Sequence, residues 1–261
     1  MVTGGGNGIG RELVLQLLKH GAKVAAVDKD AAGLQTTSEK AGRPMHNLGL
    51  FTADISQRME VEKLASDVTA RFGRVDGLIN NAGIIQPFVR IKDLDYAQIE
   101  RVMNVNFYGT LFMTKVFLPV ILKQSEGHIV NISSMGGFLP VPGQGVYGAS
   151  KAAVKLLSEA LYAELTDTRV RVTTVFPGAV DTDIVRNSGI APPPQASTGS
   201  KATKSVSARD AASCILDAVE SDAFRVIVGP DSRFMDRLYR FSPRLAVDTI
   251  TRRLKSLLAG R

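Results

Sequence analysis

The sequence has almost no cysteine and no long apolar run, and each absence excludes a class of protein. Cys214 is the only cysteine, so the chain can form neither an internal disulfide nor a zinc quartet nor a redox pair of cysteines. No window approaches the roughly 18 consecutive apolar residues of a membrane span. The glycine-rich start, residues 1–10, is not typical of an export signal. A reducing cytoplasm is therefore expected, and no metal site.

An excess of one charge is also absent from most of the chain. The formal net charge is +7, yet residues 223–261 alone hold nine Arg and Lys against three Asp, a net of +6. The rest of the chain is therefore near neutral, and its basic end is a separate feature. With 44% hydrophobic and 22% charged residues, the composition is that of an ordinary globular protein with a packed core.

Short apolar runs alternate along the chain with longer segments of helical periodicity. This alternation is typical of βαβ units, which build a parallel sheet with helices on both faces. The expected strands cover residues 1–3, 23–27, 48–53, 77–80, 128–132, 171–176 and 225–228. The expected helices cover residues 9–20, 58–72, 96–123, 146–166 and 208–221. We therefore predict a single α/β domain with a doubly wound sheet of about seven strands. Its first strand is so short that we expect a trimmed start.

One segment inside the expected domain has a different composition. Residues 187–207 are rich in Pro, Ser, Thr and Lys, and residues 192–194 are three consecutive prolines. A helix cannot continue through such a run, so we expect a mobile substrate flap. Lys201 and Lys204 lie in this flap. Such lysines are usually solvated, and contact with an anionic part of a larger substrate is the alternative.

A glycine-rich turn joins the first expected strand to the first expected helix. Glycines let the backbone approach a pyrophosphate, and a helix start offers unpaired N–H groups with a positive dipole end. Glycines also form ordinary loops, so this turn alone is weak evidence for a dinucleotide site. Its residues are Thr3, Gly4, Gly5, Gly6, Asn7, Gly8, Ile9 and Gly10.

Asp28 strengthens the assignment of a dinucleotide site. It ends the second expected strand, eighteen residues after Gly10, close to the spacing at which a carboxylate binds the adenosine ribose. A carboxylate there repels the 2′-phosphate of NADP, so NAD is the expected cofactor. Lys29 directly follows and is able to contact that phosphate, which keeps NADP as the alternative. If the glycine turn is no dinucleotide site, Asp28 is a plain helix cap.

Further motifs follow the glycine turn at regular places along the chain. They are Asp54 with Ile55 after the third strand, Asn80-Asn81-Ala82-Gly83 after the fourth, Asn106 in Asn-Phe-Tyr-Gly, Ser134 after the fifth, Tyr147 with Lys151, and Pro177-Gly178 with Val180 and Thr182. In this order they resemble the short-chain dehydrogenase/reductase family, from Thr3 to about Val228. The resemblance implies a Rossmann-type fold and an oxidoreductase that transfers a hydride to or from a nicotinamide dinucleotide.

The resemblance also implies which residues bind that cofactor. They are Gly4, Asn7, Gly8, Ile9, Gly10, Asp28, Asp54, Ile55, Asn81, Ala82, Gly83, Tyr147, Lys151, Pro177, Gly178, Val180 and Thr182. Thr182 is implied to orient the nicotinamide carboxamide, with a plain strand-ending turn as the alternative.

Tyr147 and Lys151 are the expected centre of catalysis. Residues four apart share one face of a helix, so their side chains are expected to lie side by side. A phenol titrates near about 10, and an adjacent ammonium stabilises the phenolate and lowers that pKa. Tyr147 is then able to take a proton from an alcohol or give one to a carbonyl oxygen. By resemblance, Lys151 also binds the nicotinamide ribose.

Two further catalytic residues are implied by the resemblance. Ser134 is implied to bind the substrate oxygen, and its neighbour Ser133 points to the opposite face because side chains alternate along a strand. Asn106 lies within an expected helix, where asparagine is unfavourable. It is implied to hold a water in the proton relay to Lys151, and a buried amide at a helix kink is the alternative.

The residues expected around the reactive carbon are largely apolar. They lie in residues 84–88 and 136–144 and at Ile184 with Val185, with no Arg or Lys among them. The apolar members of the first two segments include Ile84, Ile85, Phe88, Phe138, Leu139 and Val141. We therefore predict a largely apolar secondary alcohol or ketone as substrate, and a small acid bound by its carboxylate is disfavoured. Gln86 and Gln144 are the polar side chains nearby. Gln144 is a predicted substrate contact, together with Ser134 and Tyr147.

The chain continues past the expected catalytic domain, residues 1–230, into a basic amphipathic helical extension, residues 231–261. Arg233, Arg237, Arg240 and Arg244 form a basic stripe, and Phe234, Leu238, Phe241 and Leu245 form an apolar stripe beside it. Pro243 is expected to divide the extension into two helices. Docking on the protein itself or on a second subunit is favoured, with peripheral membrane contact as the alternative. Nucleic acid is not expected, because no aromatic platform accompanies the charge.

Two alternatives remain open in the sequence, one for the oligomeric state and one for the activity. The resemblance implies a homodimer or homotetramer built on the two long helices around Asn106 and Tyr147, and the C-terminal extension argues against the tetramer. An active oxidoreductase is the leading hypothesis. A dinucleotide-binding sensor or scaffold that acts through the basic tail is the alternative. Such a protein is expected to lose a catalytic residue, whereas Asn106, Ser134, Tyr147 and Lys151 are all present.

Overall fold

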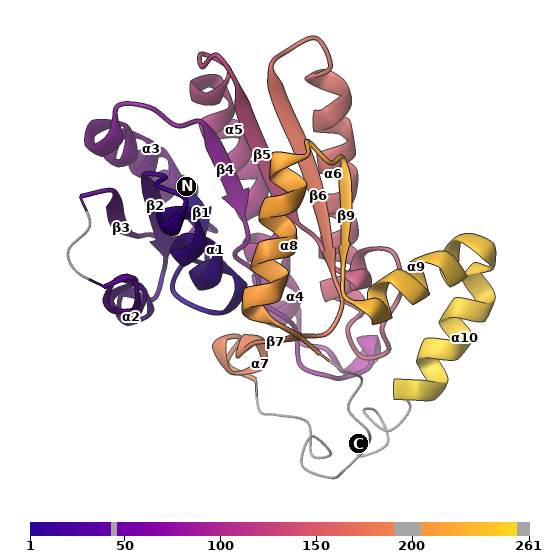
Figure 1. The fold of residues 1–261 in the computed structure, drawn as a ribbon. Coiled ribbons are helices and arrows are strands. Elements are labelled where there is room, and N and C mark those ends of the chain that lie inside the picture. The colour runs from indigo at the N-terminus through magenta and orange to yellow at the C-terminus, as the bar shows by residue number, and fades with distance from the viewer. Residues whose placement is uncertain (43–45, 191–204, 255–261) are drawn as a thin grey trace.

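Seven parallel strands form the central sheet of the protein (Figure 1). The computed structural model describes residues 1–42, 46–190 and 205–254. The strands are β1 (Val2–Thr3), β2 (Val24–Asp28), β3 (Leu48–Thr52), β4 (Gly77–Asn80), β5 (Gly127–Ile132), β6 (Val170–Pro177) and β9 (Arg225–Val228). They lie in the order β3-β2-β1-β4-β5-β6-β9. The predicted doubly wound sheet in a single domain is confirmed, and its strand order reverses between β1 and β4.

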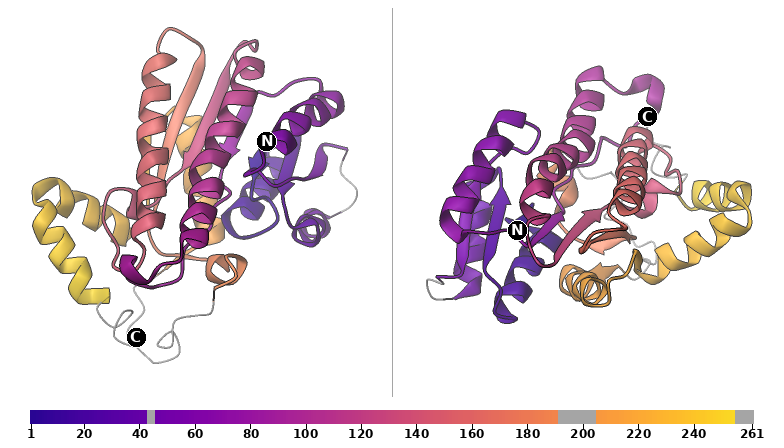
Figure 2. Two further views of the ribbon diagram at one scale, coloured as in Figure 1. Left: turned by 180° about the vertical axis from the view of Figure 1, so that it is seen from behind. Right: turned by 90° about the horizontal axis from the view of Figure 1, so that it is seen from above.

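Helices cover both faces of the sheet, as the two views of Figure 2 show. One face carries α1 (Gly8–Lys19), α2 (Ala31–Ala41) and α8 (Ala208–Glu220). The other face carries α3 (Arg58–Phe72), α5 (Thr110–Ile121) and α6 (Gly145–Glu164). Each group of helices packs on the sheet through its own buried apolar cluster.

Alternation along the strands divides the apolar core between these two clusters. In β2, Ala25 and Val27 pack beneath α3, α5 and α6, whereas Val24 and Ala26 pack beneath α1, α2 and α8. Successive side chains of a strand point to opposite faces, so a continuous apolar run buries both sides of the sheet. This packing holds the carboxyl ends of the strands together at one edge, where the predicted site lies.

The expected helix over residues 96–123 is interrupted near its middle. A π-helical turn, Asn104–Gly109, separates α4 (Tyr96–Met103) from α5. Asn106 lies in this turn, and its side chain leaves the helix to bond the backbone of Ile84. Such single π turns are frequent at functional sites.

Two other segments differ from the expected elements. α2 is not among the expected helices, because it buries only Gly33, Leu34 and Thr37 and so lacks a clear apolar stripe. At the start of the expected flap, residues 187–207, the chain forms the short helix α7 (Ile184–Asn187). At the end of the flap, β8 (Val206–Ser207) pairs with β7 (Val180–Asp181). Residues 191–204, which include Lys201 and Lys204, lie outside the described residues.

The chain continues after β9 into two helices that dock on the protein's own body. α9 (Pro230–Phe241) and α10 (Pro243–Leu254) pack on each other and form the C-terminal hairpin, residues 230–254. Pro243 begins α10, so it divides the extension as expected. Met235, Ala246 and Ile250 of the hairpin are buried together with Leu139, in the segment that follows β5.

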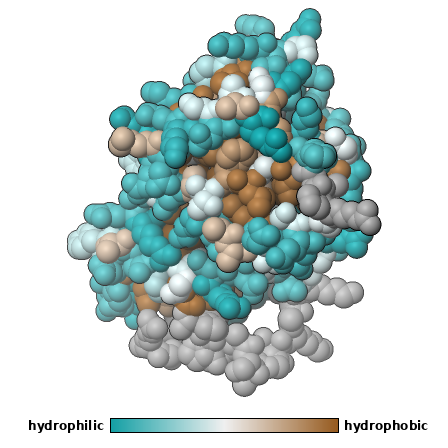
Figure 3. Space-filling view, turned by 90° about the vertical axis from the view of Figure 1, so that its left-hand side faces the viewer, coloured by the Kyte–Doolittle hydropathy of each residue, from teal (hydrophilic) through white to brown (hydrophobic). Residues whose placement is uncertain are grey.

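The edge of the sheet formed by β3 faces the viewer in Figure 3. An apolar area lies in the middle of this face and is surrounded by hydrophilic side chains. Leu50 of β3 is 38% exposed.

Within residues 1–42, 46–190 and 205–254, no helix combines the length and the apolar character that crossing a bilayer requires.

Candidate active site

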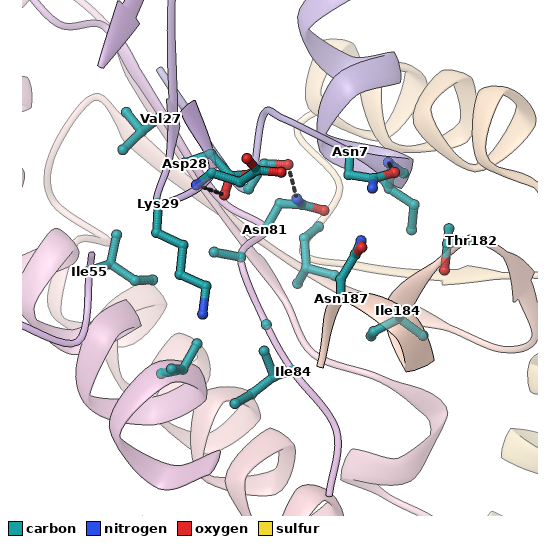
Figure 4. Close-up of a pocket in the computed structure, with 18 of the residues that line it drawn as sticks. Asn7, Val27, Asp28, Lys29, Ile55, Asn81, Ile84, Thr182, Ile184 and Asn187 are labelled. Atoms are coloured by element: carbon teal, nitrogen blue, oxygen red, sulfur yellow. Dashed lines mark hydrogen bonds between the residues drawn. The ribbon is translucent and has the colours of Figure 1, made fainter. Parts of the chain in front are cut away.

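A cavity of about 260 Å³ lies at the carboxyl ends of the strands. Segments far apart in the chain meet around it (Figure 4). Predicted cofactor and catalytic residues on its wall are Gly4, Asn7, Gly8, Ile9, Asp28, Asp54, Ile55, Asn81, Ala82, Gly83, Tyr147, Lys151 and Thr182. The wall also contains Val27, Lys29, Asp30, Ala53, Ile84, Val105, Ile132, Ser133, Ile184 and Asn187. This cavity is called the cleft below.

The glycine turn forms one end of the cleft. Gly4 adopts a φ of +68° and lies so close to Asn81 that a Cβ atom would be 2.8 Å from its Nδ2 atom, so only glycine fits there. Asn7 caps α1 by accepting a hydrogen bond from Gly8 N at 2.6 Å. Gly10 is not on the cleft wall. A Cβ on it would overlap the carbonyl oxygen of Gly4, so it lets α1 pack against the turn.

Asp28 is held at the end of β2 by two backbone amides. Its Oδ2 atom accepts from Gly6 N at 2.9 Å, and its Oδ1 atom accepts from Asp30 N at 3.1 Å. These bonds fix the carboxylate beside the glycine turn, with lone pairs left for the hydroxyls of a ribose. Lys29 extends along the same cleft (Figure 4). Both residues that bear on the choice between NAD and NADP therefore line the cleft.

Asn81 connects β4 to the glycine turn. Its Nδ2 atom donates to Thr3 O at 2.9 Å, and its backbone N–H donates to Thr3 Oγ1 at 3.0 Å. Ala82 N donates to the same hydroxyl at 3.1 Å. Farther along the cleft, Asp54 accepts from Ser56 N at 2.9 Å. The predicted cofactor residues after β1, β3 and β4 are thus fixed mainly through backbone contacts.

Tyr147 and Lys151 lie on the first turns of α6 and both face the cleft. Lys151 is 4% exposed, and its ammonium donates to Ile132 O, at the end of β5, at 2.8 Å. Ser134 is not on the cleft wall, whereas Ser133, which was expected to point away, is. The Oγ atom of Ser134 accepts from Gly136 N at 3.0 Å, and Gly136 also lies against the Tyr147 ring, so Ser134 is close to that side chain. The geometry therefore brings the serine, the tyrosine and the lysine together.

The pKa values of this group differ from the sequence-based expectation. Burial raises the pKa of the Tyr147 phenol, and the hydrogen bond from Ser134 lowers it by less. Burial also lowers the pKa of Lys151 to about 8. The Lys151 ammonium is directed to the Ile132 carbonyl. At neutral pH the phenol is thus protonated and able to donate.

Asn106 is fully buried and lies close to Lys151 without lining the cleft. Its Oδ1 atom accepts from Ile84 N, and its Nδ2 atom donates to Ile84 O and to Ser150 Oγ, each at 2.9 Å. A Cβ atom on Gly83 would lie 3.0 Å from Lys151 Nζ and 3.3 Å from Asn106 Oδ1. Both donors of the Asn106 amide and one acceptor site are thus used within the protein, and its place in a proton relay to Lys151 stays a prediction.

Gln86 has a role that the sequence does not indicate. Its side chain is fully buried, and its Oε1 atom accepts from Val146 N at 2.8 Å and from Tyr147 N at 3.0 Å. Its Nε2 atom donates to Gly143 O at 2.9 Å. Gln86 therefore caps the N-terminus of α6 and fixes the backbone of Tyr147. No local pattern could have revealed a cap that comes from sixty residues away.

Several other predicted residues lie away from the cleft wall. Gln144 is buried, donates to Gln86 O at 2.7 Å and lines a separate cavity beside the C-terminal hairpin. Leu139 is fully buried against the hairpin, not against the cleft. Both were expected near the reactive carbon. The loop that follows β5 turns them away from the cleft.

The Pro177-Gly178 segment supports Thr182 without lining the cleft. Gly178 N donates to Val228 O at 2.9 Å, and Ala179 N donates to Asp231 Oδ2 at 2.8 Å. Val180 pairs with Val206 in the short β7–β8 ribbon. The ribbon leads to Thr182, which does face the cleft (Figure 4).

α7 closes one side of the cleft. Ile184 and Asn187 line it (Figure 4). The next residue, Ser188, is fully buried and accepts a hydrogen bond from Ile85 N at 3.0 Å. Ile84 and Ile184 are thus the apolar residues of the predicted substrate region that reach the cleft.

Comparison with known proteins identifies the family of this chain. The family model for short chain dehydrogenase matches residues 1–192. A protein of Mycobacterium tuberculosis named as the oxidoreductase SadH is 37% identical over 246 residues, which are 92% of this chain and 89% of that protein.

Two solved structures are similar over nearly the whole chain. A short-chain dehydrogenase/reductase from Burkholderia phymatum in complex with NAD has a TM-score of 0.83 and 27% identity, covering 94% of this chain and 93% of that one. A short-chain dehydrogenase from Burkholderia cenocepacia in complex with NADP has a TM-score of 0.78 and 29% identity, covering 95% of each chain. The protein therefore belongs to the short-chain dehydrogenase family of NAD- or NADP-dependent oxidoreductases.

Proposed function

We propose that the protein interconverts a largely apolar ketone and the matching secondary alcohol, with Tyr147 as the general acid and base. The observation that carries this proposal is the group formed by Tyr147, Lys151 and Ser134 beside the cleft. A phenol at one end of a cleft, next to a serine hydroxyl, suits proton transfer to or from a substrate oxygen.

The residues around the cleft fit a nicotinamide dinucleotide. Gly4 leaves room where a Cβ atom would collide with Asn81, and Asp28 offers a fixed carboxylate to a ribose. When bound, the dinucleotide supplies or accepts the hydride. Thr182 would hold its carboxamide, and Lys151 would hold the ribose next to it.

The chain's own residues handle the oxygen and its proton. Ser134 donates a hydrogen bond to the substrate oxygen and positions it beside Tyr147. In reduction the protonated phenol of Tyr147 donates its proton to that oxygen, and in oxidation the phenolate accepts it back. Lys151 faces the same cleft, so its positive charge favours the phenolate formed during reduction. Asn106 contributes by fixing Ile84 and Ser150 around this group.

The preferred cofactor is NAD, because the Asp28 carboxylate repels a 2′-phosphate. Lys29 lies on the same wall, and its positive charge attracts a 2′-phosphate. Replacing Asp28 by Asn is expected to tighten NADPH binding while NADH binding weakens, as measured by fluorescence titration. Lys29→Gln is the matched variant and is expected to weaken NADPH alone. Equal NADH and NADPH affinities in the unaltered protein would remove the role given to Asp28.

The substrate is proposed to be largely apolar, since Ile84, Val105, Ile132 and Ile184 line the same cleft as Tyr147. A panel of hydrophobic ketones and a panel of short keto acids can be compared by the loss of NADH absorbance. Faster turnover of the apolar ketones is expected. Preference for the keto acids would contradict this substrate class.

We also propose a homodimer in the cytoplasm, formed through α5 and α6. Leu156 and Tyr162 on α6 are 65% and 43% exposed, and Tyr108 next to α5 is 43% exposed. Burying these side chains against the same helices of a second copy stabilises the dimer. Leu156→Lys is expected to shift the mass measured by light scattering toward the monomer, and an unchanged mass would place the interface elsewhere.

A catalytically weak sensor or scaffold is not favoured, because the proton-transfer group is complete. Peripheral membrane contact through the C-terminal hairpin is compatible with the proposed reaction. The proposed reaction does not require it.

A further inference from the structure

The outer side of the C-terminal hairpin exposes three large apolar side chains. Phe241 is 85% exposed, Phe234 is 51% exposed and Leu245 is 45% exposed. The inner side of the same two helices is already packed on the body around Leu139. Among the described residues, none of these exposed side chains takes part in docking the hairpin on the body.

Arginine side chains surround these apolar residues. The exposed arginines of the hairpin that form no ion pair with a described residue are Arg233, Arg237, Arg244, Arg252 and Arg253. Arg240 differs, because it is paired with Asp236 at 3.2 Å. Asp248 is the one exposed acidic residue within the described part of the hairpin. The outer side is therefore strongly positive as well as apolar.

The spacing of these residues places both kinds of side chain together. On α9, Arg233 and Arg237 are four residues apart, and Phe234 and Phe241 are seven apart, so the two pairs form neighbouring stripes on one side of the helix. The guanidinium of Arg253 on α10 lies 5.9 Å from the centre of the Phe234 ring. The two helices thus present one continuous surface.

The outer side of the hairpin lies where a large partner can reach it. In Figure 1 the hairpin projects from the β9 side of the body, and α10 runs toward the end of the molecule where the strands have their carboxyl ends. The cleft lies at that same end. A large flat partner is therefore able to contact the hairpin without reaching over the rest of the body.

We infer that the outer side of the C-terminal hairpin binds the surface of an anionic lipid bilayer. Arginines contact the lipid phosphates and carboxylates, and the phenylalanine rings enter the boundary between headgroups and acyl chains. A second copy is the less suitable occupant, because two such surfaces would bring like charges together. This binding does not depend on the proposed reaction.

Vesicle sedimentation of the full chain tests this inference. The protein is expected to sediment with vesicles of phosphatidylcholine mixed with phosphatidylserine and to stay in solution with vesicles of phosphatidylcholine alone. Changing Arg233, Arg237 and Arg244 together to Gln is expected to weaken binding by about a hundredfold, since each basic residue near the membrane contributes about a fivefold factor. Phe234→Ser with Phe241→Ser is expected to weaken binding by about tenfold.

A matched triple variant separates this surface from general positive charge. Lys19, Lys63 and Arg169 are exposed on other parts of the body, and changing all three to Gln removes the same total charge. This control is expected to retain vesicle binding. Equal sedimentation with both kinds of vesicle, or an equal loss in the control, would overturn the inference. So would self-association through Phe241, detected by light scattering, without binding to vesicles. Turnover of a soluble ketone is expected to be unchanged in all three variants.

Discussion

Two adjacent serines at the end of β5 have different roles. The Ser133 hydroxyl is buried and donates to Lys151 O at 2.7 Å, whereas Ser134 lies beside Tyr147. Ser134→Ala is expected to lower kcat/KM for the ketone by about a hundredfold, because a donor to the developing oxyanion is lost. Ser133→Ala is expected to lower the free energy of unfolding by about 1 kcal/mol and to leave kcat/KM nearly unchanged. Steady-state kinetics and urea unfolding measure both effects. The assignment is wrong if the two variants lose activity equally.

Gln86 positions Tyr147 through the backbone of α6. Gln86→Leu leaves two amide N–H groups and one carbonyl without a partner, so we expect the free energy of unfolding to fall by about 2 kcal/mol. We also expect kcat to fall by about tenfold with little change in NADH affinity, because the phenol is misplaced while the cofactor wall is intact.

A matched glutamine tests this role of Gln86. Gln124 donates to Val120 O near the far end of α5, and Gln124→Leu is expected to leave kcat unchanged. Gln86→Glu keeps the acceptor for Val146 N and Tyr147 N and is expected to restore part of kcat. A loss of stability without any loss of kcat would limit Gln86 to a structural role.

At the scale of elements, one ion pair attaches the C-terminal hairpin to β9. Asp236 and Arg225 are 12% and 18% exposed and lie 2.7 Å apart. Burial acts to raise the pKa of Asp236, but the hydrogen bonds and charges of Arg225 and Arg240 lower it below its ordinary value. The pair therefore contributes stability that is fully present above the carboxyl's unfolded pKa and is lost as the pH falls below it.

Asp236→Ala is expected to release the hairpin. Arg225 would be left buried without its partner, at a cost of about 3 kcal/mol. Hydrogen exchange should then become faster in residues 230–254, while the sheet keeps its protection. Asp248→Ala, at an exposed site on α10, is the control. Unchanged exchange in the hairpin of the Asp236 variant would show that its apolar packing is sufficient.

Elements with a strong pattern are predictable from this sequence, and those held by distant contacts are not. β4 and α3 have the expected ends, because an apolar run and a clear helical stripe define them. The π-helical turn is not predictable, since it depends on bonds from Asn106 to Ile84, which lie far apart in the sequence. The amphipathic pattern of the hairpin predicts two helices, but not that their partner is Leu139.

The residues of the candidate site, which come from the whole length of the chain, also divide into those that the sequence predicts and those that it does not. Asp28, Tyr147 and Lys151 carry motif signals, and the fold brings them to one cleft. The direction of Gln144, which lies away from the cleft, depends on the loop that follows β5 and is not defined by the sequence pattern. The raised pKa of Tyr147 was not predictable, since spacing reveals a neighbouring lysine but not the burial of the phenol.

The stability of the whole molecule is expected to decrease under mildly acidic conditions through His128. This side chain is 13% exposed and lies 2.8 Å from Thr173 Oγ1 and 3.7 Å from Asp222. Burial lowers its pKa below 6.5, Asp222 acts to raise it and Arg171 to lower it. Below about pH 6.5 the unfolded chain therefore binds more protons at this site than the folded protein does. The free energy of unfolding consequently decreases as the pH is lowered.

Urea unfolding from pH about 7 to pH about 5 measures this decrease. His128→Gln is expected to flatten the dependence, whereas His20→Gln, at a site with 61% side-chain exposure, is expected to leave it unchanged. An equally steep dependence in the His128 variant would place the titrating group elsewhere.

Above all, we propose that Tyr147 exchanges the proton while a bound nicotinamide exchanges the hydride. The most direct test of this proposal is the rate of NADH oxidation by an apolar ketone in Tyr147→Phe, with NADH affinity measured by fluorescence on the same sample. We expect this variant to bind NADH about as tightly as the unaltered protein does and to oxidise it more slowly by a factor of about a thousand. NADH oxidation at the unaltered rate by the Tyr147→Phe protein would contradict the proposal.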